Sequence, residues 1–371
     1  MNKKPYSVCI TSGKGGTGKS IISASISYIL AHCGFKTLLV DMDLFTHGLT
    51  YYVLAEYPRD SPYFTADLFQ SESSIYNFKP ILIPHYFTKN NLEFAPSIKR
   101  TGRPKAEWGM IDKLSNFNNF LGTMNLFIHH LSEKNKYDYI IIDTRGGADI
   151  TSVGSSIATK AYIIVTEADK PSWDMGRLLI DTIDSYQNEL NYETDRIGFI
   201  INKNVLPPEA IEVFLKKEWQ SAHLATIPLD ENAVRYYQED KIPVAEKIHC
   251  QFSLKILEII RKTFVDENWT KENMKSFENI EQKAIKEKKQ KEMEIKKKKN
   301  AIKLGITVRG YIYSILLIFL YINETYNIFS LGTTQMSILF SSIIIIIIMM
   351  IGFEQIIYKI KIVNIEISGS D

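Results

Sequence analysis

Cysteine is scarce in this sequence. The 371 residues include three cysteines, Cys9, Cys33 and Cys250, which lie far apart and form no C-x-x-C pair. An odd number of widely spaced cysteines argues against a disulfide framework and against a zinc site, and it fits a reducing compartment. The first sixteen residues contain no long apolar run, so we also expect no signal peptide.

Most of the chain also lacks an excess of positive charge. The formal net charge is +2, and residues 281–303 hold ten Lys and four Glu. The rest of the chain therefore carries 34 Lys and Arg against 38 Asp and Glu. A slightly acidic body gives no strong electrostatic footprint for DNA. We expect no nucleic-acid partner, although a small local basic patch stays open as an alternative.

Strand and helix patterns alternate over residues 1–265. The strand candidates are rich in Ile, Val and Tyr and apolar at successive positions, as in strands buried on both faces of a parallel sheet. They are Tyr6–Thr11, Lys36–Asp41, Asp138–Asp143, Ala161–Thr166, Arg196–Asn202 and His223–Ile227. Helices are expected at Ser20–Cys33, Asn116–Asn135 and Trp173–Leu190. The pattern predicts an α/β fold with a doubly wound, mostly parallel sheet, and residues 51–110 as an excursion at its rim.

The first strand candidate runs into a glycine-rich loop that precedes a helix. Residues 13–20 match G-x-x-x-x-G-K-[ST] in the strand–loop–helix context that phosphate binding requires. The glycines let backbone N–H groups face phosphate oxygens, and the helix N-terminus adds partial positive charge. The motif assigns Lys19 to the β- and γ-phosphates and the Ser20 hydroxyl to Mg²⁺. The predicted nucleotide ligands are Gly13, Lys14, Gly15, Gly16, Thr17, Gly18, Lys19 and Ser20.

Lys14 is not required by the general pattern. It precedes Gly15 and Gly16, and this loop resembles the deviant Walker A motif of the ParA/MinD family of P-loop ATPases. The resemblance covers about residues 5–262 and implies ATP and Mg²⁺ as cofactors, slow hydrolysis stimulated by a partner or a dimer, and a homodimer around ATP. There Lys14 would reach the partner's phosphates and add positive charge where the transition state gathers negative charge.

The stretch Leu38–Asp43 resembles the family's second strand, which ends in Asp-x-Asp. By that match Asp43 positions the attacking water and joins Lys14 and Lys19 as a catalytic residue. Asp41 would support the Mg²⁺ shell. The alternative is that Asp41 only caps the end of the strand.

The stretch Tyr137–Thr144 resembles the Walker B strand of the family. It would place Asp143 at the carboxyl edge of the sheet, where open α/β sheets bind ligands. Asp143 would hold a Mg²⁺-bound water, and it completes a metal set with Ser20 and Asp41. The switch loop that should sense the γ-phosphate follows as Arg145-Gly146-Gly147, where many relatives have Pro-Pro-Gly. Arg145 is therefore a departure from the family pattern.

Recognition of the base is assigned to the ends of the last two strands. Asn202-Lys203 resembles the family's adenine-contacting segment. A guanine reader would follow Asn-Lys with Asp two positions later, whereas this chain has Val205, which favours ATP over GTP. Pro228 and Asp230 are carried over from the family's segment that flanks the base.

The C-terminal part changes in composition. Glu278–Lys303 is charged and predicts an exposed single helix. Met336–Phe353 is an uncharged stretch of 18 residues that suits a bilayer span, and Ile306–Ile322 is a weaker second candidate that contains Arg309. The lysines flanking the pair predict a multi-pass protein of the cytoplasmic membrane with both termini in the cytoplasm. The expected organisation is an ATPase domain over 1–265, a charged helical linker over 266–305, a transmembrane hairpin over 306–353 and a tail over 354–371.

Several functions compete. The first is a membrane-anchored ATPase switch that recruits or regulates an unidentified protein partner in a membrane-associated complex. The alternatives are a DNA-partition ATPase and a structural subunit in which ATP stabilises an interface. A capsule-type tyrosine kinase is disfavoured because such kinases lack an equivalent of Lys14 and end in a tyrosine cluster, whereas the tail here has Tyr358 alone. ATPases that rely on paired cysteines do not fit three isolated ones.

Overall fold

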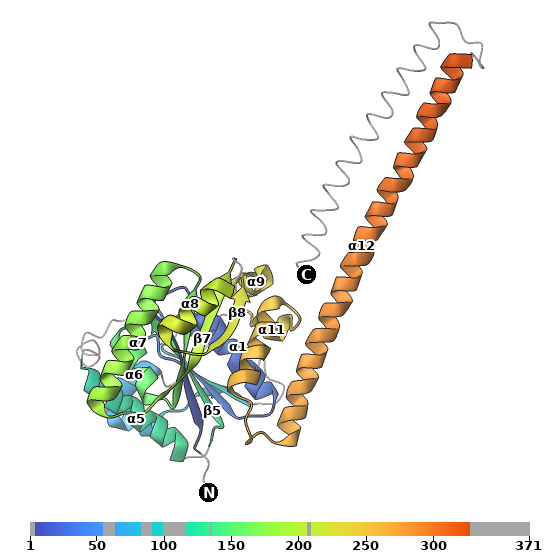
Figure 1. Cartoon of the computed structure of the whole chain (residues 1–371). Coiled ribbons are helices and arrows are strands. Elements are labelled where there is room, and N and C mark those ends of the chain that lie inside the picture. Colours follow the sequence, from blue (N-terminus) through green and yellow to red (C-terminus); the bar gives the residue numbers. More distant parts are fainter. Residues whose placement is uncertain are drawn as a thin grey trace. The chain divides into compact units, whose positions relative to one another are not determined.

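The computed structural model describes residues 4–54, 64–82, 91–98, 116–133, 136–205 and 209–326 (Figure 1). The chain divides into two compact units, Met1–Glu287 and Lys288–Asp371. The first unit holds the sheet, the helices that cover it and the predicted nucleotide site.

An eight-stranded sheet forms the centre of the first unit, in the order β3-β4-β2-β5-β1-β6-β7-β8. All neighbouring strands pair parallel except β3 and β4, which pair antiparallel. The strands are β1 (Tyr6–Ser12), β2 (Thr37–Asp41), β3 (Ile81–Leu82), β4 (Leu92–Ala95), β5 (Tyr139–Gly146), β6 (Ala161–Glu167), β7 (Asp195–Asn204) and β8 (His223–Pro228). The predicted doubly wound α/β fold and its six strands are confirmed.

Helices cover both faces of the sheet, which explains why its central strands are apolar at successive positions (Figure 1). One face packs against α1 (Lys19–His32), α2 (Gly48–Val53), α9 (Glu231–Gln238), α10 (Pro243–Glu246) and α11 (Gln251–Thr263). The other packs against η1 (Thr65–Phe69), α3 (Glu72–Asn77), α5 (Phe117–Glu133), α6 (Ile150–Ala158), α7 (Lys170–Leu190) and α8 (Glu209–Trp219). The three predicted helices correspond to α1, α5 and α7.

The predicted excursion at residues 51–110 is structured in part. Within it, β4 pairs with β2 and continues the parallel sheet, and β3 adds an antiparallel edge strand. The sequence pattern missed both strands because they contain only four and two residues. Residues 55–63, 83–90 and 99–110 of this stretch lie outside the described part of the chain.

The charged segment forms α12 (Lys271–Tyr326), as predicted for Glu278–Lys303. The prediction of a multi-pass membrane protein is wrong, because none of the helices among the described residues is both long and apolar enough to cross a bilayer. In α12 the uninterrupted apolar run, 310–322, has 13 residues, whereas a span needs about 20. The other predicted crossing, 336–353, and the predicted tail, 354–371, lie outside the described residues.

Helices α5 and α6 pack closely enough to require glycine at one contact. A Cβ at Gly154 in α6 would stand 2.5 Å from Cδ1 of Phe120, a fully buried ring of α5. Gly122, also in α5, is exposed, and a Cβ there would meet nothing within 4 Å. The two glycines therefore form a matched pair, one in a packed contact and one on an open surface.

We expect Gly154→Ala to lower the free energy of unfolding by about 1–3 kcal/mol, because the added methyl overpacks the contact with Phe120. Gly122→Ala should raise it by about 0.5–1 kcal/mol, because alanine has the better helix propensity. Urea denaturation followed by circular dichroism measures both. Equal effects of the two substitutions would show that α5 and α6 are not packed as described.

Candidate functional site

The phosphate loop lies between the carboxyl end of β1 and the start of α1. Gly16 and Gly18 have φ angles of +81° and +88°, which side-chain-bearing residues rarely adopt. Gly13 has no room for a side chain, because its Cβ would stand 2.2 Å from the carbonyl carbon of Met175 in α7. These glycines give the loop the curvature that turns backbone N–H groups towards an anion at the helix N-terminus.

Lys19 opens α1 and is 6% exposed. Its ammonium group donates a hydrogen bond to the Ser12 hydroxyl at 2.9 Å, and that hydroxyl donates to the Lys14 carbonyl at 2.6 Å. Burial lowers the pKa of Lys19, while the Asp143 and Asp43 carboxylates act in the opposite direction. The Lys19 ammonium group is thus buried at the phosphate loop, beside two carboxylates that favour its charged form.

Asp143 and Ser20 lie together, as the metal prediction requires. The Asp143 carboxylate accepts hydrogen bonds from the Ser20 hydroxyl at 2.6 Å and from the Ser23 hydroxyl at 2.9 Å. Burial raises the pKa of Asp143 to about 6, although Lys19 and the two hydroxyls oppose the shift. A hydroxyl and a carboxylate are the oxygen ligands that Mg²⁺ prefers beside nucleotide phosphates. The residues present therefore fit this ion.

Asp41 is committed to bonds within the chain. Its carboxylate accepts hydrogen bonds from the Asp43 N–H, from the N–H and hydroxyl of Thr50, and from the Ser97 hydroxyl, at 2.6–2.9 Å. Burial and then the nearby Asp143 raise the pKa of Asp41 to about 7. Of the two roles that the sequence left open, this geometry favours the strand-end cap, and the metal role stays a prediction.

Asp43, the predicted water-positioning residue, begins a turn that leads into α2. Its carboxylate accepts hydrogen bonds from the N–H groups of Phe45 at 3.2 Å and Thr46 at 2.8 Å, and from the Thr46 hydroxyl. His47 then adopts a left-handed conformation with φ of 56°, and its ring bonds the Ser97 hydroxyl at 2.9 Å. The turn fixes the direction of the Asp43 carboxylate.

Lys14 is held by two acids that sequence reasoning missed. Its ammonium group lies 3.1 Å from the Glu167 carboxylate at the end of β6 and 3.0 Å from the Asp169 carboxylate. Burial lowers the pKa of Lys14, but hydrogen bonds to Asp169 and Glu167 outweigh it and raise the value overall. Asp169 also caps α7 by accepting the Ser172 N–H at 2.8 Å. This Asp-x-x-Ser cap was the available sequence signal.

The predicted switch loop, Arg145-Gly146-Gly147, lies against the phosphate loop. A Cβ at Gly146 would stand 2.2 Å from the Lys14 carbonyl carbon, and the Gly147 N–H donates to the Ser12 carbonyl at 2.9 Å. A movement of the phosphate loop would therefore displace the end of β5 and Gly147, which follows it.

The predicted base-side residues do not all converge. The Asn202 amide donates to the Thr17 carbonyl at 2.8 Å, and Lys203 donates to the Gly16 carbonyl and pairs with Glu167 at 3.0 Å. Asp230 instead caps α9 and accepts the Phe252 N–H of α11 at 2.9 Å. Pro228 ends β8 and is half-buried. The roles of Pro228 and Asp230 at the base stay predictions.

Among the described residues, no group of three or more His, Cys, Asp or Glu side chains is arranged to hold a metal ion. A Mg²⁺ ion at Ser20 and Asp143 would therefore need ligands from the nucleotide and water, which is the usual arrangement for this cation.

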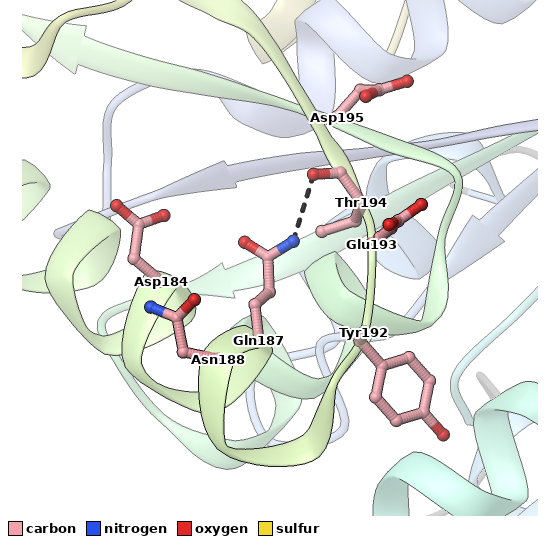
Figure 2. Close-up of a pocket in the computed structure, with 7 residues that line it drawn as sticks. All are labelled: Asp184, Gln187, Asn188, Tyr192, Glu193, Thr194 and Asp195. Atoms are coloured by element: carbon pink, nitrogen blue, oxygen red, sulfur yellow. Dashed lines mark hydrogen bonds between the residues drawn. The ribbon is translucent and has the colours of Figure 1, made fainter.

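A cavity of about 350 Å³ lies at the opposite edge of the sheet, between the end of α7 and the start of β7 (Figure 2). Figure 2 shows the Gln187 amide donating to the Thr194 carbonyl, a bond of 3.1 Å. The carboxylates of Asp184, Glu193 and Asp195 also line it, but they do not converge on one point. This cavity is not part of the nucleotide site.

The raised pKa of Asp143 predicts a pH-dependent stability. Because its folded pKa of about 6 lies above the ordinary 3.8, the stabilisation from the bound proton is complete below about pH 4 and is lost as the pH rises through 6. Asp143→Asn, which mimics the protonated acid, should therefore gain stability relative to the parent chain between pH 4 and 7, by at most about 1.4 kcal/mol per pH unit. Urea denaturation without nucleotide or Mg²⁺ measures the difference, and a pH-independent difference would contradict the assignment.

Known proteins share this fold. The chain is 28% identical over 162 residues to a putative septum site-determining protein MinD of Oltmannsiellopsis viridis, which covers 44% of this chain and 45% of that protein. The solved structure of MinD from Pyrococcus horikoshii with Mg-ADP matches with a TM-score of 0.52 and 22% identity, over 70% of this chain and 96% of that one. MinD in the MinC:MinD complex of Aquifex aeolicus matches with a TM-score of 0.52 and 18% identity, over 72% and 98%. At these identities the structural matches show a shared fold.

The family model of the CobQ/CobB/MinD/ParA nucleotide binding domain matches residues 8–244. This range begins in β1 and contains the phosphate loop, the Asp43 turn, Asp143 and the base-side residues. The chain therefore belongs to the CobQ/CobB/MinD/ParA nucleotide-binding family.

Proposed function

We propose that this chain is a switch that binds ATP with Mg²⁺, forms a dimer around the nucleotide and is reset by ATP hydrolysis. The observation that carries the proposal is the ion pair of Lys14 with Glu167 and Asp169. Lys14 is a phosphate-loop cation that the chain's own loop does not need for binding, and its side chain is 32% exposed. Such a lysine is available to a second chain.

The residues of the site would have separate roles in the binding and hydrolysis of ATP. Gly13 to Gly18 supply backbone donors, and the buried Lys19 would neutralise phosphate charge. Ser20 and Asp143 would hold the Mg²⁺ ion, which supplies charge neutralisation at the phosphates when it is bound. Asp43 would orient the attacking water, and its turn keeps the carboxylate in one direction. Asp41 would act on this site by holding Asp43 and the start of α2 in place.

Dimer formation has a local cost in this arrangement. To reach a partner's phosphates, Lys14 must leave Glu167 and Asp169, which lie about 3 Å from its ammonium group. The pairs are partly exposed, so each is worth little in water, and the doubly negative charge of a terminal phosphate would replace them. We infer that ATP bound to the partner attracts Lys14 to its phosphates. Without ATP in the partner, Lys14 stays paired with Glu167 and Asp169.

The dimer would in turn recruit or regulate a partner protein. MinD of Aquifex aeolicus was solved in complex with MinC, and this supports a protein partner for the present chain. We place the ATPase domain at residues 1–265, followed by the charged helical segment at 266–305. Recovery of the same proteins by an Asp43→Ala chain with and without ATP would contradict the switch.

Single substitutions separate binding from turnover. Lys19→Ala should abolish ATP binding, measured by equilibrium dialysis. Lys14→Ala and Asp43→Ala should retain binding but lower kcat about 100-fold or more, because each removes transition-state stabilisation or water positioning. Lys36→Ala, which alters an exposed lysine at the opposite edge of the sheet, is the matched control and should keep the parent rate.

A structural role for the nucleotide predicts a different outcome. In that case Lys14→Ala and Asp43→Ala would both support partner binding as the parent chain does, while Lys19→Ala would not. Full ATPase activity in Lys14→Ala would also remove the shared-site account.

A further inference from the structure

Arg145 joins two segments of the candidate site that are far apart in the sequence. Its guanidinium carbon lies 5.0 Å from the centre of the Phe45 ring. This distance is that of a cation–π contact. Arg145 lies near the end of β5, and Phe45 lies in the turn that follows Asp43, so the contact connects the predicted switch loop with the predicted water-positioning residue.

The Arg145 end of the contact is anchored to the phosphate loop. The Ser152 hydroxyl donates to the Arg145 carbonyl at 2.7 Å. The next two residues, Gly146 and Gly147, contact the backbone of Lys14 and bond the Ser12 carbonyl. The backbone from which the Arg145 side chain extends is therefore fixed relative to the nucleotide-binding loop.

The Phe45 end is attached to Asp43. The Phe45 N–H donates to the Asp43 carboxylate at 3.2 Å, and the neighbouring Thr46 N–H donates at 2.8 Å. Phe45 is 46% exposed, so burial alone does not fix its ring. A displacement of the ring would move the N–H groups that orient the Asp43 carboxylate.

We propose that Arg145 is a positioning residue for ATP hydrolysis, which acts through the Phe45 ring to hold the Asp43 turn. This inference rests on the proposed function of Asp43. It assigns a role to the residue at which the chain departs from the Pro-Pro-Gly pattern of many relatives. Small misplacements of a positioned water cost large factors in rate, so one contact of this strength is sufficient to matter.

Kinetics of single and double variants test the pair. Arg145→Gln and Phe45→Leu should each lower kcat about 3- to 30-fold, the range of a partly desolvated cation–π contact, with the KM for ATP within about twofold. The double variant should be no slower than the slower single one, because both changes remove the same contact. Phe45→Trp keeps an aromatic face and should keep most of the rate.

The matched control is a cation–π pair at the opposite edge of the sheet. The Lys160 ammonium group lies 5.9 Å from the centre of the Tyr6 ring. Lys160→Gln removes a comparable contact without touching the Asp43 turn and should leave kcat unchanged. Arg145 and Phe45 are both partly exposed, so their variants should fold, and thermal melting checks this.

A second readout needs no hydrolysis. Hydrogen–deuterium exchange of the Phe45 and Thr46 amides, without nucleotide, should be about 3- to 30-fold faster in Arg145→Gln than in the parent chain and unchanged in Lys160→Gln. If the parent chain hydrolyses no ATP, the proposed function fails, while this measurement still shows whether Arg145 holds the turn.

Three results would overturn the proposal. The first is unchanged amide exchange in Arg145→Gln. The second is additive loss of kcat in the double variant. The third is a slow Arg145→Gln beside a fully active Phe45→Leu, which would mean that the guanidinium acts on the phosphates without the Phe45 ring.

Discussion

The candidate site depends on two places where backbones touch without an intervening side chain. At Gly13 a Cβ would stand 2.2 Å from the Met175 carbonyl carbon, and at Gly146 it would stand 2.2 Å from that of Lys14. Real Cβ atoms do not approach other atoms so closely, so both positions require glycine. Through these contacts the phosphate loop is fixed against α7 on one side and against the end of β5 on the other.

This close packing brings functional groups from three separate segments of the chain together. Lys14 and Lys19 come from the phosphate loop, Asp43 follows β2, and Asp143 lies in the carboxyl-terminal half of β5. The parallel strands bring these residues to one edge of the sheet. Lys19 and Asp143 stabilise each other's charged form. Burial lowers the pKa of Lys19 and Asp143 raises it, whereas burial raises the pKa of Asp143 and Lys19 lowers it. Binding of a polyanion would change this balance of charge at the phosphate loop. The end of β5 touches that loop and would move with it.

Much of this arrangement was predictable from the sequence. Six strands are marked by continuous apolar runs, and the Gly-rich loop is specific enough to locate the phosphate site. The register that pairs Asp41 with Asp143 agrees with parallel pairing of the two predicted strands Lys36–Asp41 and Asp138–Asp143, which both end in Asp. The short β4 was not predictable, because four residues carry too little periodicity.

The partners of Lys14 were not predictable either. Asp169 is 155 residues away from Lys14 in the sequence. A carboxylate that follows a strand is also typical of a helix cap, and Asp169 does cap α7. The contact of Arg145 with Phe45 depends on side-chain directions that no local pattern encodes. The prediction that residues 306–322 form a second, weaker membrane span was wrong, because their uninterrupted apolar run is only 13 residues long.

The central claim is that ATP brings two chains together through Lys14. Sedimentation velocity of the Asp43→Ala chain, which should retain bound ATP, measures this directly. The account predicts a monomer without nucleotide, a species of twice that mass with ATP and Mg²⁺, and a monomer under both conditions once Lys14→Ala is added. A chain that stays monomeric with ATP, or one that dimerises equally well without Lys14, would contradict it.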